Sequence, residues 1–199
     1  MIMLYHAPGT RSFRVLWMLE ELGVPYELQM LDLEQQEQKS APFLELNPMG
    51  KVPTLVDGRT KLTESAAICA WLADRFPEKG LAPAMDATAR PDYLRWMFFA
   101  PGCVEPAFTE KLNNYATDPR QAAWGSFDDV IATIGPAVDQ GRYLLGKAFC
   151  AADIMVGSVV RWGVFAGLVS DPVLLGYNER LGKRSAHQLA CEIDSELAP

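Results

Sequence analysis

The sequence lacks the features that mark several classes of protein. No apolar run approaches the roughly 20 residues that a membrane-spanning helix needs. The N-terminal segment MIMLYHAP has no basic leader of the kind that opens a signal peptide. Basic residues are outnumbered, because 18 Lys and Arg face 25 Asp and Glu and leave a net charge of −7. We therefore expect a soluble cytoplasmic protein with no membrane and no nucleic-acid partner.

Cysteine and histidine are also scarce. The chain has four cysteines and two histidines, namely Cys69, Cys103, Cys150, Cys191, His6 and His187. None forms a CxxC pair or a Cys/His cluster with metal-ligand spacing, so no metal site and no disulfide framework are predicted. We expect buried, reduced thiols, and the pattern assigns neither histidine a role.

The first 76 residues mix strand and helix signals. Apolar or alternating segments at 2–5, 26–30, 52–56 and 61–63 indicate strands. Helical spacing follows the first strand, recurs around 40–46, and returns at 68–76 after the Asp57-Gly58 turn. The order β-α-β, helical connection, β-β-α predicts an α/β domain of thioredoxin-like fold, with the first two strands parallel.

The rest of the chain shows no convincing strand. We expect residues 1–78 to form the thioredoxin-like domain, 79–87 a linker rich in Pro, Ala and Gly, and 88–199 an all-helical domain. Helical patterns cover Arg90–Phe99, Ala122–Ile134, Ala151–Leu168, Pro172–Leu181 and Ser185–Leu197.

A proline at the mouth of the third strand, in NPMGKVPTL, removes a ladder donor. A cis Val52-Pro53 bond is one reason to keep it, and it would turn the backbone of Val52 outward to pair with an extended peptide. The alternative is an ordinary edge-strand proline.

Two further patterns place polar groups at helix starts. In LTESAAI a strand runs directly into a helix whose free N–H groups, with Ser65 and Glu64, suit the carboxylate and ammonium of an α-amino acid. In YHAPGTRSFRV, hydroxyls at Thr10 and Ser12 enter a helix and would stabilise a thiolate. Plain helix capping is the alternative interpretation of both patterns.

The segments APGTRSFRVLW, NPMGKVPTL and TESAAICAWLADRFP together resemble the glutathione-binding domain of the cytosolic glutathione transferase family. The segment FCAADI resembles the start of that family's central core helix. The likeness spans nearly the whole chain. The subgroup it resembles is bacterial or fungal, with activation of the thiol by a serine rather than a tyrosine hydroxyl. The sequence departs from the family at Thr10, where serine is usual, and at Cys150, where serine or threonine is usual as part of a capping box with the aspartate three residues on. Asp153 is still expected to accept from the Cys150 N–H.

The resemblance implies a role for each matching position. Val52 would pair with the cysteinyl part of glutathione beside a cis Pro53, Glu64 and Ser65 would hold the γ-glutamyl head, and Lys51 and Gln38 would reach the glycyl end. Thr10, four residues before Arg14, matches the activating hydroxyl, with Ser12 and Tyr5 as alternatives. The resemblance implies a second-substrate pocket, although for each of its residues a place in the core is the favoured alternative: Tyr93, Trp96, Met97, Ala100 and Cys103.

These roles imply an enzyme that conjugates reduced glutathione to electrophilic apolar small molecules, as in detoxification. Glutathione would be a substrate, no cofactor would be tightly bound, and a homodimer is expected. The alternatives are a non-catalytic binding or regulatory module, or another glutathione-dependent reaction such as peroxide reduction, lysis or isomerisation.

Overall fold

The computed structural model describes residues 1–198 of the 199-residue chain. The chain divides into two compact units, one formed by residues 1–76 with 184–198 and the other by Pro77–Lys183. The first unit is an α/β domain and the second is helical. Among the described residues, no helix has the length and hydropathy to cross a membrane.

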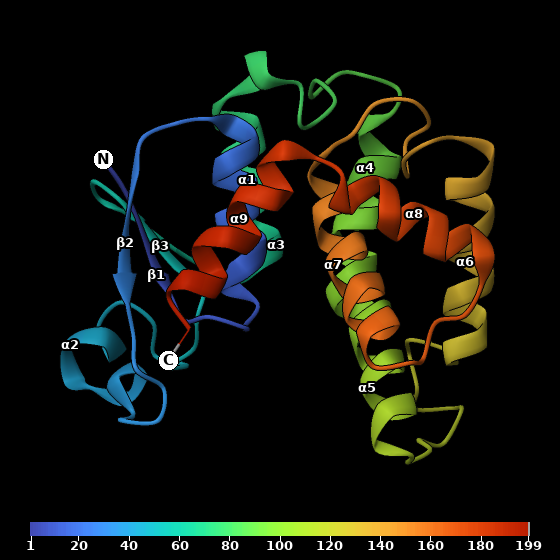
Figure 1. Ribbon diagram of the computed structural model, residues 1–199, viewed down its shortest axis with the longest axis horizontal. Coiled ribbons are helices and arrows are strands. Elements are labelled where there is room, and N and C mark those ends of the chain that lie inside the picture. The colour runs from blue at the N-terminus through green and yellow to red at the C-terminus, as the bar shows by residue number, and fades with distance from the viewer. Residues whose placement is uncertain (199) are drawn as a thin grey trace. The chain divides into compact units, whose positions relative to one another are not determined.

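The first unit is built on a mixed four-stranded sheet of order β2-β1-β3-β4, in which β1 and β2 are parallel and the other pairs antiparallel. The parallel pair confirms the arrangement of the first two strands that the sequence predicts. Figure 1 shows α1, α3 and α9 together on one side of this sheet and α2 on the other. The elements are β1 (Ile2–His6), α1 (Ser12–Leu22), β2 (Tyr26–Met30), η1 (Glu37–Lys39), α2 (Ala41–Leu44), β3 (Thr54–Asp57), β4 (Thr60–Thr63), α3 (Ser65–Arg75) and α9 (Ser185–Glu196).

Helix α9 corrects the expected domain boundary. The sequence-based division placed residues 88–199 in the helical domain, whereas α9 packs on α1. Two interactions explain this placement: Arg184 donates to both carboxylate oxygens of Glu21 at 2.6 and 2.7 Å, and the His187 ring meets Trp17 edge-on at 4.6 Å. An amphipathic pattern predicts that a helix forms but does not say which surface it covers.

The second unit consists of η2 (Pro77–Lys79), α4 (Arg90–Phe99), the π-helical turn η3 (Ala100–Val104), α5 (Glu105–Asn113), α6 (Phe127–Gln140), α7 (Ala151–Phe165) and α8 (Pro172–Gly182). Helix α7 lies at its centre, and its first six residues are all buried. Helix α5 is absent from the sequence prediction. The predicted helix Ala122–Ile134 begins later than expected, because Ser126 and Asp129 form a capping box at the start of α6.

The start of α7 is organised around the buried carboxylate of Asp153. Its oxygens accept from the N–H groups of Leu144 and Cys150, both at 2.9 Å, and from the Tyr177 hydroxyl at 2.8 Å. Burial raises the pKa of Asp153, and these hydrogen bonds oppose that shift. The predicted bond from the Cys150 N–H to Asp153 is therefore confirmed. In addition, the Cys150 thiol donates to the same carboxylate at 3.5 Å.

Candidate functional site

The strand register brings the three sequence motifs to one end of the sheet. Thr54, the first residue of β3, pairs with Tyr5 near the end of β1 and with Thr63 at the end of β4. The segments that follow β1, precede β3 and follow β4 therefore meet beside Thr54. Each carries part of the expected glutathione site, although the first of them lies tens of residues before the other two in the sequence.

The turn between β1 and α1 holds the two predicted hydroxyls next to each other. Thr10 Oγ1 lies 2.7 Å from Ser12 Oγ and donates to the Ala7 carbonyl at 2.7 Å. The Ser12 N–H donates in turn to Thr10 Oγ1 at 3.2 Å. Ser12 is fully buried, whereas Thr10 is partly exposed. Thr10 is thus the hydroxyl that a ligand at this turn can reach.

Behind these hydroxyls lie two residues that the sequence reasoning did not assign. Ser12 Oγ is 2.8 Å from Nδ1 of the buried His6. His6 Nε2 lies 3.1 Å from Asp194 Oδ1, within ion-pair distance though not aligned as a hydrogen bond. Asp194 Oδ2 also accepts from the Gly9 N–H at 3.1 Å. Nothing local signals Asp194, because it reaches the turn from the far end of the chain.

The loop before β3 is held from inside by Asn47. Its buried side chain donates to the Lys51 carbonyl at 2.8 Å and to Thr54 Oγ1 at 3.2 Å, and its Oδ1 accepts from the Met49 N–H at 3.1 Å. The Val52-Pro53 bond is cis, as expected. Val52 is partly exposed and Pro53 is buried.

Glycine is required in this loop at Gly50. Its φ of 59° is one that other residues rarely adopt. A Cβ there would also come within 2.7 Å of the Gln38 carbonyl. The Gln38 side chain donates to the Leu33 carbonyl at 3.4 Å, and its Oε1 is buried with no hydrogen-bond partner among residues 1–198. The side chain of Lys51 is exposed.

The β4–α3 junction carries the backbone strain expected of a ligand clamp. Glu64 has a φ of 67°, which is costly for a residue with a Cβ, and makes no capping hydrogen bond to α3. Ser65 is buried, and its Oγ accepts from Arg14 Nη1 at 3.3 Å. A hydroxyl that accepts from Arg14 keeps its own proton to donate. Arg14 is therefore a supporting residue that the sequence reasoning used only to locate Thr10.

Most of the residues expected to line a second-substrate pocket are buried. Four of them are buried in the helical unit, with at most 2% of their surface exposed: Tyr93, Trp96, Met97 and Ala100. Their placement matches the alternative interpretation, in which they are core. Cys103 is partly exposed within η3, and burial raises the pKa of its thiol.

The thiols are free, as expected, but only two of the four are buried, Cys69 and Cys150. Burial raises the pKa of Cys69 to about 12, so it stays protonated at neutral pH. Cys103 and Cys191 are partly exposed, which corrects the expectation for those two.

Sequence comparison gives the family. Residues 1–74 match the model described as the glutathione S-transferase N-terminal domain. Glutathione S-transferase GST-4.5 of Xanthomonas campestris is 32% identical over 173 residues, covering 83% of this chain and 84% of that protein. The match to glutathione S-transferase 3 of Schizosaccharomyces pombe, at 36% identity, spans only 43% of that longer protein and 53% of this chain.

Solved structures agree with that assignment. A glutathione transferase from Methylococcus capsulatus superposes with a TM-score of 0.84 at 29% identity, covering 98% of this chain and all of that one. A sphingomonad glutathione S-transferase complexed with glutathione gives a TM-score of 0.81 at 30% identity, covering 97% and 98% of the two chains. The chain described here therefore belongs to the cytosolic glutathione S-transferase family.

Proposed function

We propose that this protein conjugates reduced glutathione to electrophilic apolar small molecules. The observation that carries the proposal is the convergence of the cis Val52-Pro53 turn, the strained Glu64 and the Thr10 turn at one end of the sheet. In this assignment the Val52 backbone pairs with the cysteinyl unit, as an added strand would. Glu64 meets the γ-glutamyl ammonium, and Ser65, backed by Arg14, donates to its carboxylate.

In the same proposal, the glycyl end of glutathione binds beside Lys51, in the loop before β3. Lys51 is exposed there and offers a positive charge to the glycyl carboxylate. Gln38 has a buried amide oxygen that no donor in the described part of the chain reaches. Such an acceptor costs free energy unless a donor reaches it, and a glutathione N–H is a donor of the right kind.

Thr10 is the residue that we assign to thiol activation. A free thiol titrates near about 8.5, and lowering that pKa by roughly two units costs about 2.7 kcal/mol. One hydrogen bond to a charged group, about 1.5–3 kcal/mol, together with the start of α1 supplies energy of that order. Ser12 is fully buried, and Tyr5 packs its ring on Phe43 at 5.4 Å, so neither is as well placed.

The test has two steps, retention on immobilised glutathione and then turnover of a reactive aryl halide. We expect both from the wild-type protein. Glu64→Gln should lose most retention, because it removes the charge that meets the ammonium group. Glu78→Gln, the same change in η2, should behave as wild type. A wild-type protein that is not retained would contradict the proposal.

One observation favours a second function, glutathione binding without conjugation. Four of the five residues expected to form the electrophile pocket are core, and Cys103 is the partly exposed member of that set. Retention on glutathione without turnover would support a binding or regulatory role, or a peroxide-reducing, lytic or isomerising reaction. Assays with a peroxide and an unsaturated ketone separate these outcomes.

We also propose that the protein is a cytoplasmic homodimer, with the thioredoxin-like unit of one copy against the helical unit of the other. Support comes from the family and from two apolar side chains one turn apart on α4, Leu94 and Phe98, which expose 38% and 71% of their surface. Light scattering at micromolar concentration should give twice the 22.0 kDa chain mass. A mass of one chain would contradict this assignment.

A further inference from the structure

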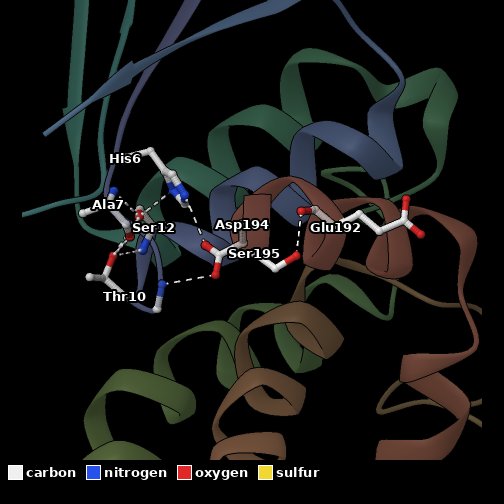
Figure 2. Close-up of polar contacts among 8 residues, drawn as sticks. His6, Ala7, Thr10, Ser12, Glu192, Asp194 and Ser195 are labelled. Carbon is white, nitrogen blue, oxygen red and sulfur yellow. Dashed lines mark hydrogen bonds and ion pairs between the residues drawn. The ribbon is translucent and has the colours of Figure 1, made fainter. Parts of the chain in front are cut away.

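A continuous chain of polar contacts runs from the partly exposed Thr10 hydroxyl to the carboxylate of Asp194 on α9 (Figure 2). Its links are Thr10 Oγ1 to Ser12 Oγ at 2.7 Å, Ser12 Oγ to His6 Nδ1 at 2.8 Å, and His6 Nε2 to Asp194 Oδ1 at 3.1 Å. We propose that His6 accepts the thiol proton of bound glutathione through this chain and that Asp194 balances the charge His6 acquires. The inference rests on the proposed function, because it needs a thiol beside Thr10.

Asp194 sets the resting state of the imidazole. A carboxylate beside Nε2 favours the tautomer with its proton on that nitrogen, since the other tautomer would turn a lone pair toward the negative charge. Nδ1 is then an acceptor and faces Ser12 Oγ. The resting protein therefore presents an empty proton site at the inner end of the chain.

The transfer moves one proton and balances. The S–H bond of glutathione breaks as its proton goes to Thr10 Oγ1. The proton that Thr10 donates to the Ala7 carbonyl turns away from it and passes to Ser12 Oγ, and the Ser12 proton forms an N–H bond at His6 Nδ1. Both hydroxyls end with one proton each. The products are a thiolate at the turn and an imidazolium inside the domain.

Burial explains why the proton transfer needs Asp194. The side chains of His6 and Ser12 have no exposed surface, so water is excluded from this part of the proton path. A buried imidazolium is costly unless it is paired with an opposite charge. Asp194 supplies that charge and is itself held by the Gly9 N–H at 3.1 Å. All of these groups belong to the first unit.

The first experiment reads the charge of His6 directly. The chain has only two histidines, so ¹⁵N-histidine labelling gives two ring systems, and the one lost in His6→Asn belongs to His6. We expect a neutral ring protonated at Nε2 in the free protein and a doubly protonated ring once glutathione is bound. A ring that stays neutral while thiolate absorbance develops would overturn the proposal, because a purely structural His6 would behave in that way.

The second experiment follows the thiolate absorbance of bound glutathione against pH. Asp194→Asn should move its midpoint up by about one pH unit, since the imidazolium loses its partner. Simple removal of a nearby negative charge would instead move the midpoint down, so the sign is diagnostic. Glu192→Gln, the same kind of change at an exposed position of α9, should leave the midpoint in place.

A double variant completes the test. If Asp194 acts through Thr10, Asp194→Asn should add nothing to the shift in a Thr10→Val background. Additive shifts, or a downward shift, would overturn the proposed proton transfer to His6 while leaving the proposed function intact. Failure of the wild-type protein to bind glutathione would remove both.

Discussion

Each unit of this protein contains a buried polar cluster that includes an aspartate on a helix, and the two clusters differ in how they end. In the helical unit, Asp153 accepts from backbone N–H groups, a hydroxyl and a thiol of its own surroundings, all of them buried. In the α/β unit, the contacts of Asp194 lead through His6 and Ser12 to Thr10, which is partly exposed. A closed cluster fixes a fold, whereas one with an exposed end is available to a ligand.

The largest effect is expected from removing the aspartate of the closed cluster. Asp153→Ala leaves several buried donors without an acceptor and should cost about 3–5 kcal/mol of unfolding free energy. Urea denaturation followed by circular dichroism measures this cost. Asp86→Ala, on an exposed loop, should leave the midpoint unchanged. A loss below about 1 kcal/mol for Asp153→Ala would show that the cluster is not a structural centre.

A smaller effect, on binding rather than stability, is expected at the start of α3. Ser65→Ala removes a hydroxyl that Arg14 supports and should weaken glutathione binding by about 1.5–3 kcal/mol, or roughly ten- to hundredfold. Titration calorimetry measures the affinity, and Ser195→Ala on the exposed side of α9 is the matched control. Unchanged affinity with a lower melting temperature would mean that Ser65 stabilises the fold, as the cluster around Asp153 does, and does not bind the ligand.

The smallest effect concerns the thiol at the start of α7. Cys150→Ser puts a hydroxyl where the thiol now meets Asp153 at 3.5 Å, and a hydroxyl is the better capping group. We expect about 0.5–1 kcal/mol of added stability, visible as a higher melting temperature. Destabilisation would mean that the apolar packing of the buried sulfur outweighs the capping contact.

The same contrast explains what the sequence could predict. The parallel first pair of strands, the cis Val52-Pro53 bond and the Cys150–Asp153 contact are local or nearly local, so spacing and turn chemistry indicate them. The packing of α9 on α1 and the approach of Asp194 to His6 join distant parts of the chain. Periodicity does not encode such pairings.

Burial is the second feature that the sequence could not predict. Tyr93 and Trp96 share a helix face with Met97, and that pattern suits a pocket as well as a core. Only packing decides, and here the partners of α4 cover that face. The family resemblance favoured Thr10 over Ser12 on its offset from Arg14, and the burial of Ser12 adds a physical reason for that choice.

The central claim is that the Thr10 hydroxyl activates the glutathione thiol, and the pH dependence of thiolate absorbance in the binary complex tests it most directly. Thr10→Val keeps the shape and removes the donor, so glutathione should still bind while the thiol midpoint rises by about one to two pH units. Thr133→Val, the same change on the exposed face of α6, should leave the midpoint at the wild-type value. A Thr10→Val complex that titrates as wild type does would contradict the account.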